Sequence, residues 1–148
     1  MIINRTIKKE LESALKNTDR KVIILYGPRQ AGKTTLIEML LPQDLSYKKY
    51  NGDDIFTQNI FSNNNLESLK REIGEKDLLI IDEAQRINNI GLSLKLIIDN
   101  LPIKVIVSGS VSFDLADKVC EPLTGRTKTF WLYPLSLREV KDKFPQME

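Results

Sequence analysis

The stretch from Ile24 to Leu36, with the sequence ILYGPRQAGKTTL, decides the fold. The first four residues of this stretch are the end of a short apolar run, residues 21–27. The run is rich in β-branched side chains and ends at a glycine. Such a run is typical of a strand buried on both faces, as in a parallel sheet. The residues that follow, 32–41, predict a helix that ends before Pro42. The stretch is therefore a strand, a glycine-containing turn and a helix in immediate succession.

The turn fits the pattern G-x-x-x-x-G-K-[ST] at every fixed position of residues 27–34. Its glycines let backbone N–H groups curl around phosphate oxygens, and the helix that follows adds its positive dipole end. Lys33 would reach the β- and γ-phosphates of a nucleotide, and the Thr34 hydroxyl would complete a Mg²⁺ shell. A chance match is the alternative, but the flanking strand and helix are the context that the mechanism requires. The residues expected to contact the nucleotide are Gly27, Pro28, Arg29, Gln30, Ala31, Gly32, Lys33, Thr34 and Thr35, with solvent exposure as the alternative for Arg29 and Gln30.

A second apolar run, over residues 77–82, ends in Asp82 and is followed by Glu83. An acidic residue at the end of a buried strand is costly unless it meets a cation or a hydrogen-bond network. Mg²⁺ on a nucleotide supplies such a partner, so Asp82 would hold the metal through a water and Glu83 would polarise the water that attacks the γ-phosphate. A Glu in this position favours hydrolysis over transfer to a small acceptor. The alternative is a surface turn with a pair of charges.

Three further residues, in two places along the chain, are candidates for contact with the reacting phosphate. A third apolar run, over residues 104–109, ends in Ser108 and is followed by Ser110, and either hydroxyl could bond the γ-phosphate or the attacking water. Turn chemistry is the alternative for these serines. Arg126 precedes a predicted strand and could stabilise transition-state charge on the nucleotide of an adjacent subunit. An exposed arginine at the start of a strand is the alternative there.

The remaining elements follow from apolar periodicity and turn residues. Further helices are expected over 5–18, 65–74, 90–100, 113–123 and 136–144, and further strands over 45–54 and 126–135, with a capping box at Ser136 and Glu139 and with Phe130, Trp131 and Tyr133 in the core. Strands that alternate with helices predict an α/β fold, a parallel sheet with helices on both faces. We expect one domain over residues 1–148.

The composition of the 148-residue chain narrows the chemistry. No histidine is present, which excludes His-based mechanisms and His-ligated metals, and a single cysteine, Cys120, excludes an internal disulfide and fits a reducing compartment. No apolar run approaches the ~20 residues that span a bilayer, and no apolar signal core opens the chain, so the cytoplasm is the expected location. The net charge of +2 does not indicate a nucleic-acid binder, although a local basic patch stays open.

These residues together resemble the AAA+ superfamily of P-loop ATPases. More narrowly, they are similar to the bacterial and archaeal AAA-domain ATPases that often carry a C-terminal domain of unknown function. The resemblance covers about residues 5–140 and is carried in order and spacing by GPRQAGKTTL, IDEAQRI, SGSVSFDL, LTGR and PLSLREV. It implies a RecA-like sheet in the order 5-1-4-3-2, Walker A and Walker B roles, sensor duty near residues 108–110, and a finger region at Arg126. Leu137 departs from the family, which often has an aromatic residue there.

The same resemblance implies a helical lid after the fifth strand, and the chain ends shortly after that strand. We therefore expect a single P-loop domain that lacks the lid and hydrolyses ATP weakly, with a homo-oligomer or a C-terminal partner domain completing it. The first hypothesis is Mg²⁺-dependent ATP binding and hydrolysis that drives or gates a larger assembly. The alternative is a nucleotide-binding switch with negligible hydrolysis. A small-molecule kinase is less well supported, because only Arg126 and Arg138 lie between residues 104 and 148, and no N-K-x-D string suggests guanine.

Overall fold

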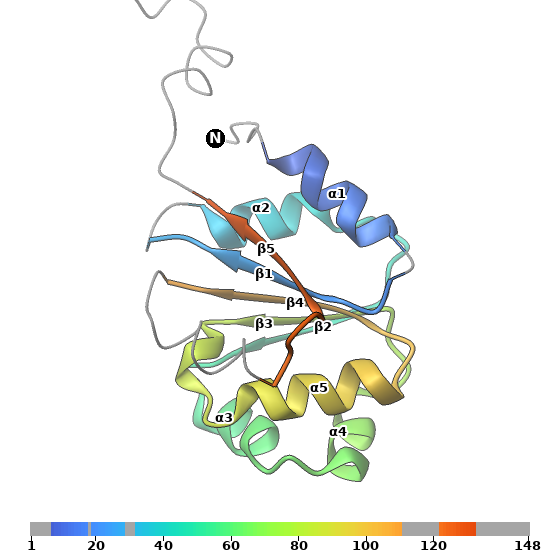
Figure 1. Cartoon of the computed structure of the whole chain (residues 1–148), viewed down its shortest axis with the longest axis vertical. Coiled ribbons are helices and arrows are strands. Elements are labelled where there is room, and N and C mark those ends of the chain that lie inside the picture. The colour runs from blue at the N-terminus through green and yellow to red at the C-terminus, as the bar shows by residue number, and fades with distance from the viewer. Residues whose placement is uncertain (1–6, 18, 29–31, 111–121, 133–148) are drawn as a thin grey trace, which may run out of the picture.

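Five parallel strands form one sheet in the order β2-β3-β4-β1-β5 in the computed structural model, which describes residues 7–17, 19–28, 32–110 and 122–132 (Figure 1). This is the predicted order 5-1-4-3-2, read from the other edge. Each pair of neighbours runs in the same direction, so all five carboxyl ends lie along one edge of the sheet. The strands are β1 (Val22–Tyr26), β2 (Tyr47–Asn51), β3 (Leu78–Asp82), β4 (Lys104–Gly109) and β5 (Thr127–Trp131).

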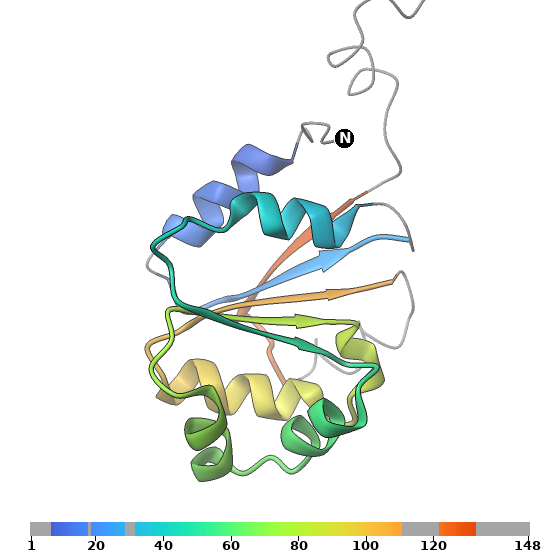
Figure 2. The same cartoon turned by 180° about the vertical axis from the view of Figure 1, so that it is seen from behind.

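Helices cover both faces of the sheet, which confirms the expected three-layer, RecA-like α/β architecture. Helices α1 and α2 lie on one face, and α3, α4 and α5 lie on the other (Figures 1 and 2). No helix among the described residues combines the length and apolar character needed to cross a bilayer. The helices are α1 (Lys8–Lys16), α2 (Lys33–Leu40), α3 (Ile55–Ser62), α4 (Leu66–Ile73) and α5 (Ile90–Asn100), with a 3₁₀ turn, η1, at Ala84–Arg86.

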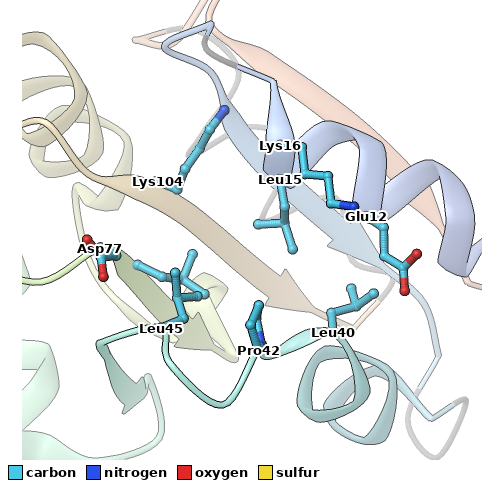
Figure 3. A pocket seen from close by; sticks show the side chains of 9 residues that line it. Glu12, Leu15, Lys16, Leu40, Pro42, Leu45, Asp77 and Lys104 are labelled. Carbon is cyan, nitrogen blue, oxygen red and sulfur yellow. The ribbon is translucent and has the colours of Figure 1, made fainter.

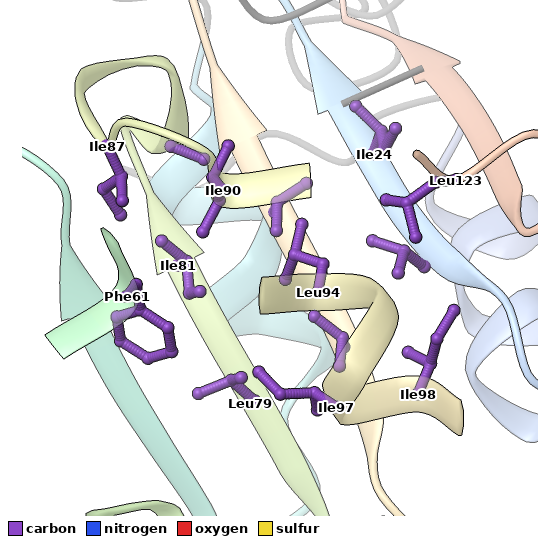
Figure 4. Packing of buried hydrophobic residues seen from close by; sticks show 14 of the residues in the cluster. Ile24, Phe61, Leu79, Ile81, Ile87, Ile90, Leu94, Ile97, Ile98 and Leu123 are labelled. Atoms are coloured by element: carbon purple, nitrogen blue, oxygen red, sulfur yellow. The ribbon is translucent and has the colours of Figure 1, made fainter. Parts of the chain in front are cut away.

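The central strands are buried on both faces, as their continuous apolar sequences predict. Every residue of β1 is buried, and alternate residues enter two separate hydrophobic clusters. Ile24 belongs to the cluster under α3, α4 and α5, where it lies among residues such as Ile81 and Leu94 (Figure 4). Ile23 belongs to the cluster under α1 and α2. The sheet is thereby held between two apolar layers, which leaves polar groups to gather at the ends of its central strands.

The edge strands differ from the central ones. Trp131, expected in the core, is 47% exposed because β5 has a neighbour on one side only. One side of its ring system stacks on buried Tyr26, with centroids 4.8 Å apart and the rings inclined by 28°. Phe130 is partly buried against the α1–α2 cluster, and Tyr133 lies outside the described residues.

On the opposite edge, β2 alternates between exposed and half-buried residues. Its Tyr50 hydroxyl donates to the Glu72 carboxylate at 2.8 Å. Burial first, and then this hydrogen bond and the negative charge of Glu72, raise the pKa of Tyr50 above its usual range, so the phenol stays protonated at neutral pH.

The predicted helices that fall within the described residues are present, with small shifts at their ends. The structure adds one helix that was not predicted. Helix α3 was not predicted, because over its eight residues only Thr57 and Phe61 are buried and the pattern is too short to give a clear period. Residues 63–65 link α3 to α4. Apart from Pro122 and Leu123, the predicted helices over 113–123 and 136–144, including the capping box, lie outside the described residues.

Candidate nucleotide-binding site

The polar residues predicted to act together meet at the carboxyl edge of the sheet. The turn after β1, the end of β3 and the end of β4 lie side by side there, because β4 pairs with both β1 and β3. This arrangement brings Lys33 and Thr34 at the start of α2 to the same edge as Asp82, Glu83 and Ser108. Residues 29–31, the middle of the turn, lie outside the described residues.

Lys33 is held inside the turn. Its ammonium donates to the carbonyl oxygens of Gly27 at 2.7 Å and Pro28 at 3.0 Å, and the residue is 6% exposed. A buried ammonium is costly without acceptors, so these carbonyls fix the charge in the mouth of the turn. Gly32 has φ 93° at the N-cap of α2, a left-handed conformation that glycine adopts without strain. The amino end of α2, with its positive dipole, therefore faces the same space as the ammonium.

Gly27 is required by close packing as well as by the motif. A Cβ atom on this residue would lie 2.4 Å from the carbonyl oxygen of Leu132, which follows β5. The Leu132 N–H in turn donates to the Tyr26 carbonyl at 2.7 Å. The start of the turn is thus fastened to the end of β5, and a side chain at position 27 would separate them.

Asp82 links three elements through its carboxylate. Its Oδ2 accepts from the Thr34 hydroxyl at 3.1 Å, and its Oδ1 accepts from the Ser108 hydroxyl and from the Glu83 N–H at 3.0 Å. Ser108 is fully buried, so its hydroxyl holds the Asp82 carboxylate from the interior of the protein. The oxygens of Thr34 and Asp82 are hard donors of the kind that Mg²⁺ prefers, and they already converge. The donor set therefore fits the predicted metal.

Glu83 sits in an unusual backbone conformation just beyond β3. Its φ of 50° and ψ of 44° are left-handed, which costs a residue with a Cβ about 1–2 kcal/mol. Its Oε2 accepts from the Gln85 amide at 2.5 Å and from the Ser110 hydroxyl at 3.3 Å. The Gln85 amide also donates to the Ser110 hydroxyl at 3.2 Å. The carboxylate is thus held by side chains from η1 and from the residue after β4.

Gly52, which follows β2, supports this backbone from the other side. Its N–H donates to the Asp82 carbonyl at 2.7 Å, and a Cβ atom would lie 2.1 Å from the Glu83 carbonyl oxygen. Neither Gln85 nor Gly52 was predicted as a site residue. The polar residue at the end of the IDEAQ string was the available signal for Gln85, whereas the contact of Gly52 depends on strand pairing that the sequence does not display.

Two predicted residues are not brought to the centre of this site. Arg126 precedes β5 at its amino end, where its Nε lies 3.1 Å from the Asp99 carboxylate and its carbonyl accepts from the Val22 N–H. The five residues of β5, at ~3.3 Å each, separate it from the carboxyl edge. Thr35 is exposed on the first turn of α2. The roles predicted for both residues stay predictions, as does a direct phosphate contact of Ser108 or Ser110.

A hollow of about 190 Å³ lies at the amino ends of β3 and β4, away from the polar carboxyl edge of the sheet (Figure 3). Its walls are mainly apolar and come from α1, the end of α2 and the segment after it. Asp77 at its rim accepts from the Ser46 N–H and hydroxyl, and Lys104 pairs with Asp19. These charged groups are engaged with the protein itself, so this hollow is not arranged for phosphate chemistry.

Comparison with known proteins agrees with this geometry. The sequence profile of the AAA domain family matches residues 19–141. An uncharacterized protein of Mycobacterium tuberculosis is 32% identical over 123 residues, which cover 80% of this chain and 26% of that protein. An uncharacterized protein of Methanocaldococcus jannaschii is 27% identical over 146 residues, which cover 90% of this chain and 30% of that protein. This chain thus spans less than a third of these relatives, and over most of its own length it belongs to the AAA domain family, whose P-loop fold indicates nucleotide binding.

Proposed function

We propose that the chain binds ATP together with Mg²⁺ and hydrolyses it at the carboxyl edge of the sheet. The observation that carries this proposal is the meeting of Thr34, Asp82 and Glu83, which come from two separate segments of the chain, beside the buried ammonium of Lys33. A structural turn would have no need of a buried ammonium, a hydroxyl and two carboxylates at one point. A nucleotide triphosphate with its metal uses all four.

Binding would rest on Lys33 and on the amino end of α2. The buried ammonium donates to the carbonyls of Gly27 and Pro28 in the turn, and the phosphate oxygens of a bound nucleotide would become its acceptors. Charge-assisted hydrogen bonds of this kind are worth about 1.5–3 kcal/mol each. The helix dipole adds to the attraction for an anion. Gly32 gives the backbone the conformation that opens α2 toward the ligand.

Thr34 and Asp82 would hold the metal. Bound Mg²⁺ neutralises charge on the β- and γ-phosphate oxygens. Thr34 would offer its hydroxyl oxygen and Asp82 its Oδ2, both hard oxygen donors of the kind that Mg²⁺ prefers. Ser108 fixes the orientation of Asp82 by donating to its Oδ1, which leaves Oδ2 facing Thr34.

Glu83 would take the proton of the attacking water. Its carboxylate is next to Asp82 in sequence and beyond the end of β3, where the γ-phosphate of a nucleotide in the turn would lie. Catalysis of this kind rests on positioning and charge stabilisation and needs no covalent intermediate. The matched stretch covers 26–30% of each of these longer relatives, and we propose that ATP turnover here drives or gates a larger assembly.

The first test is calorimetric titration of the chain with ATP and ADP, with and without Mg²⁺. We expect micromolar, Mg²⁺-dependent binding that Lys33→Ala weakens at least about 10-fold, equal to about 1.4 kcal/mol. Lys49→Ala is the control, because Lys49 pairs with Glu38 on the surface away from the turn. Absence of binding by the wild-type chain would contradict the proposed site.

Phosphate release then tests hydrolysis separately from binding. Glu83→Gln should lower kcat by about 10²–10⁴-fold, the scale of a general base, while leaving ATP affinity nearly unchanged. Glu38→Gln, at an exposed carboxylate of α2, is the matched control. Binding of ATP without turnover by the wild-type chain would reject hydrolysis and leave the nucleotide-binding switch as the function.

A further inference from the structure

We infer that Gln85 is a positioning residue, whose side-chain amide orients the Glu83 carboxylate by fastening it to the Ser110 hydroxyl. The inference rests on the proposed hydrolysis and assigns it a residue outside the P-loop and the Asp82–Glu83 pair. It concerns a residue that would not touch the nucleotide and would act through Glu83.

The three side chains form a closed triangle of hydrogen bonds. The Gln85 Nε2 lies 2.5 Å from Glu83 Oε2 and 3.2 Å from Ser110 Oγ, and Ser110 Oγ lies 3.3 Å from the same Oε2. Glu83 and Gln85 come from the turn after β3, whereas Ser110 follows β4. The triangle therefore joins two neighbouring strand ends at the point where the attacking water would be activated.

Gln85 has the chemistry that this place requires. A primary amide carries two N–H donors on one nitrogen, and here one is directed at a carboxylate and the other at a hydroxyl. It adds no charge, so it does not compete with Mg²⁺ or phosphate for the neighbouring groups. The residue is 8% exposed, and a buried amide is costly unless it is hydrogen-bonded. Its position is thus tied to its bonds with Glu83 and Ser110.

Glu83 needs such an anchor because its backbone alone does not fix its carboxylate. The left-handed backbone turns the chain sharply, but three rotatable side-chain bonds still separate the backbone from the carboxylate. Both hydrogen bonds fall on Oε2, and no described residue donates to Oε1. The arrangement holds one oxygen and leaves the other to accept a proton from water. A base misplaced by about 1 Å can lose 10²-fold in rate.

The test compares Gln85→Met with Gln43→Met. Both variants exchange an amide for an apolar chain of similar length, but Gln43 is exposed in the segment that leads from α2 to the amino end of β2. We expect Gln85→Met to lower kcat by about 10- to 100-fold with KM and the Kd for ATP changed less than about 3-fold. Gln43→Met should keep the wild-type kcat. Thermal melting of both variants shows whether each is folded.

A second comparison separates positioning from general structural support. In the Glu83→Gln background, Gln85→Met should cause no further loss in single-turnover hydrolysis, because its effect passes through the carboxylate that is already gone. An equal loss in both backgrounds, a wild-type kcat in folded Gln85→Met, or an equal loss in Gln43→Met would overturn the inference. If the wild-type chain binds ATP without hydrolysing it, the proposed hydrolysis fails and the role of Gln85 fails with it. If Glu83→Gln abolishes turnover and Gln85→Met does not reduce it, only the role of Gln85 fails.

Discussion

The hydroxyl of Thr34 lies 3.1 Å from Oδ2 of Asp82, although 48 positions separate the two residues in the chain. The contact joins the start of α2 to the end of β3 across the strand that lies between β1 and β3. It depends on the sheet order, because β4 brings the two strand ends to one edge. Under the proposed function, this contact marks the place where the metal that accompanies a nucleotide would be bound.

Replacement of Thr34 by valine removes this hydroxyl and keeps the shape of the side chain. We expect Thr34→Val to lower the affinity for ATP in the presence of Mg²⁺ by about 10-fold, because one metal ligand is lost, and to leave the affinity in EDTA unchanged. Calorimetry under the two conditions measures the difference. Thr129→Val, at an exposed position of β5, is the control. Equal weakening with and without Mg²⁺ would show that Thr34 does not serve the metal.

The sequence predicted most of the sheet because the physics of its central strands is local. β1, β3 and β4 are buried on both faces, and such strands are continuous apolar runs that need no knowledge of their neighbours to be found. The candidate site was found for a related reason. Its charged and glycine residues stand at fixed spacing after those runs, and Asp82 is an acidic residue in a place where burial demands a cation or a hydrogen-bond network.

What the sequence did not predict depends on which strands become neighbours. Trp131 is half exposed because β5 is an edge strand, and nothing in its own residues distinguishes an edge from a centre. Gly52 contacts Glu83 because Asn51 and Asp82 are register partners, a relation between segments about 30 residues apart. Gln85 carries no charge and stands in no periodic pattern, so its role is visible only in its hydrogen bonds.

Gly52→Ala adds a single methyl group and tests whether Gly52 supports the backbone of Glu83. A Cβ at this position would lie 2.1 Å from the Glu83 carbonyl oxygen, so the backbone of one residue must move. We expect Gly52→Ala to destabilise the fold by about 1–3 kcal/mol, the usual cost of overpacking, and to lower kcat as well. Urea unfolding and phosphate release measure the two effects.

The control for this prediction is Gly74→Ala, in which the new methyl group has open space. Gly74 has φ 66° and ψ −159°, a conformation essentially confined to glycine, so alanine there costs about 1–3 kcal/mol of backbone strain without touching the site. This variant should lose stability and keep its turnover at temperatures where it is folded. A Gly52→Ala chain with wild-type kcat would show that the position of the Glu83 carbonyl does not matter for turnover.

Arg126 gives a prediction about a second chain, because it lies at the end of β5 away from its own phosphate-binding turn. Its ion pair with Asp99 is 3.1 Å long, but both side chains are about 40% exposed, so the pair contributes at most about 1 kcal/mol. If the guanidinium acts as predicted on the nucleotide of a neighbouring chain, Arg126→Ala should lower turnover by about 10³-fold and leave ATP affinity and Tm almost unchanged. Turnover per chain should also rise with protein concentration in the wild type and stay flat in the variant.

Asp99→Asn weakens the same ion pair but keeps the guanidinium, so this control variant should keep full turnover. Equal losses in the two variants, or a wild-type rate per chain that does not depend on concentration, would assign Arg126 to the surface of one chain alone.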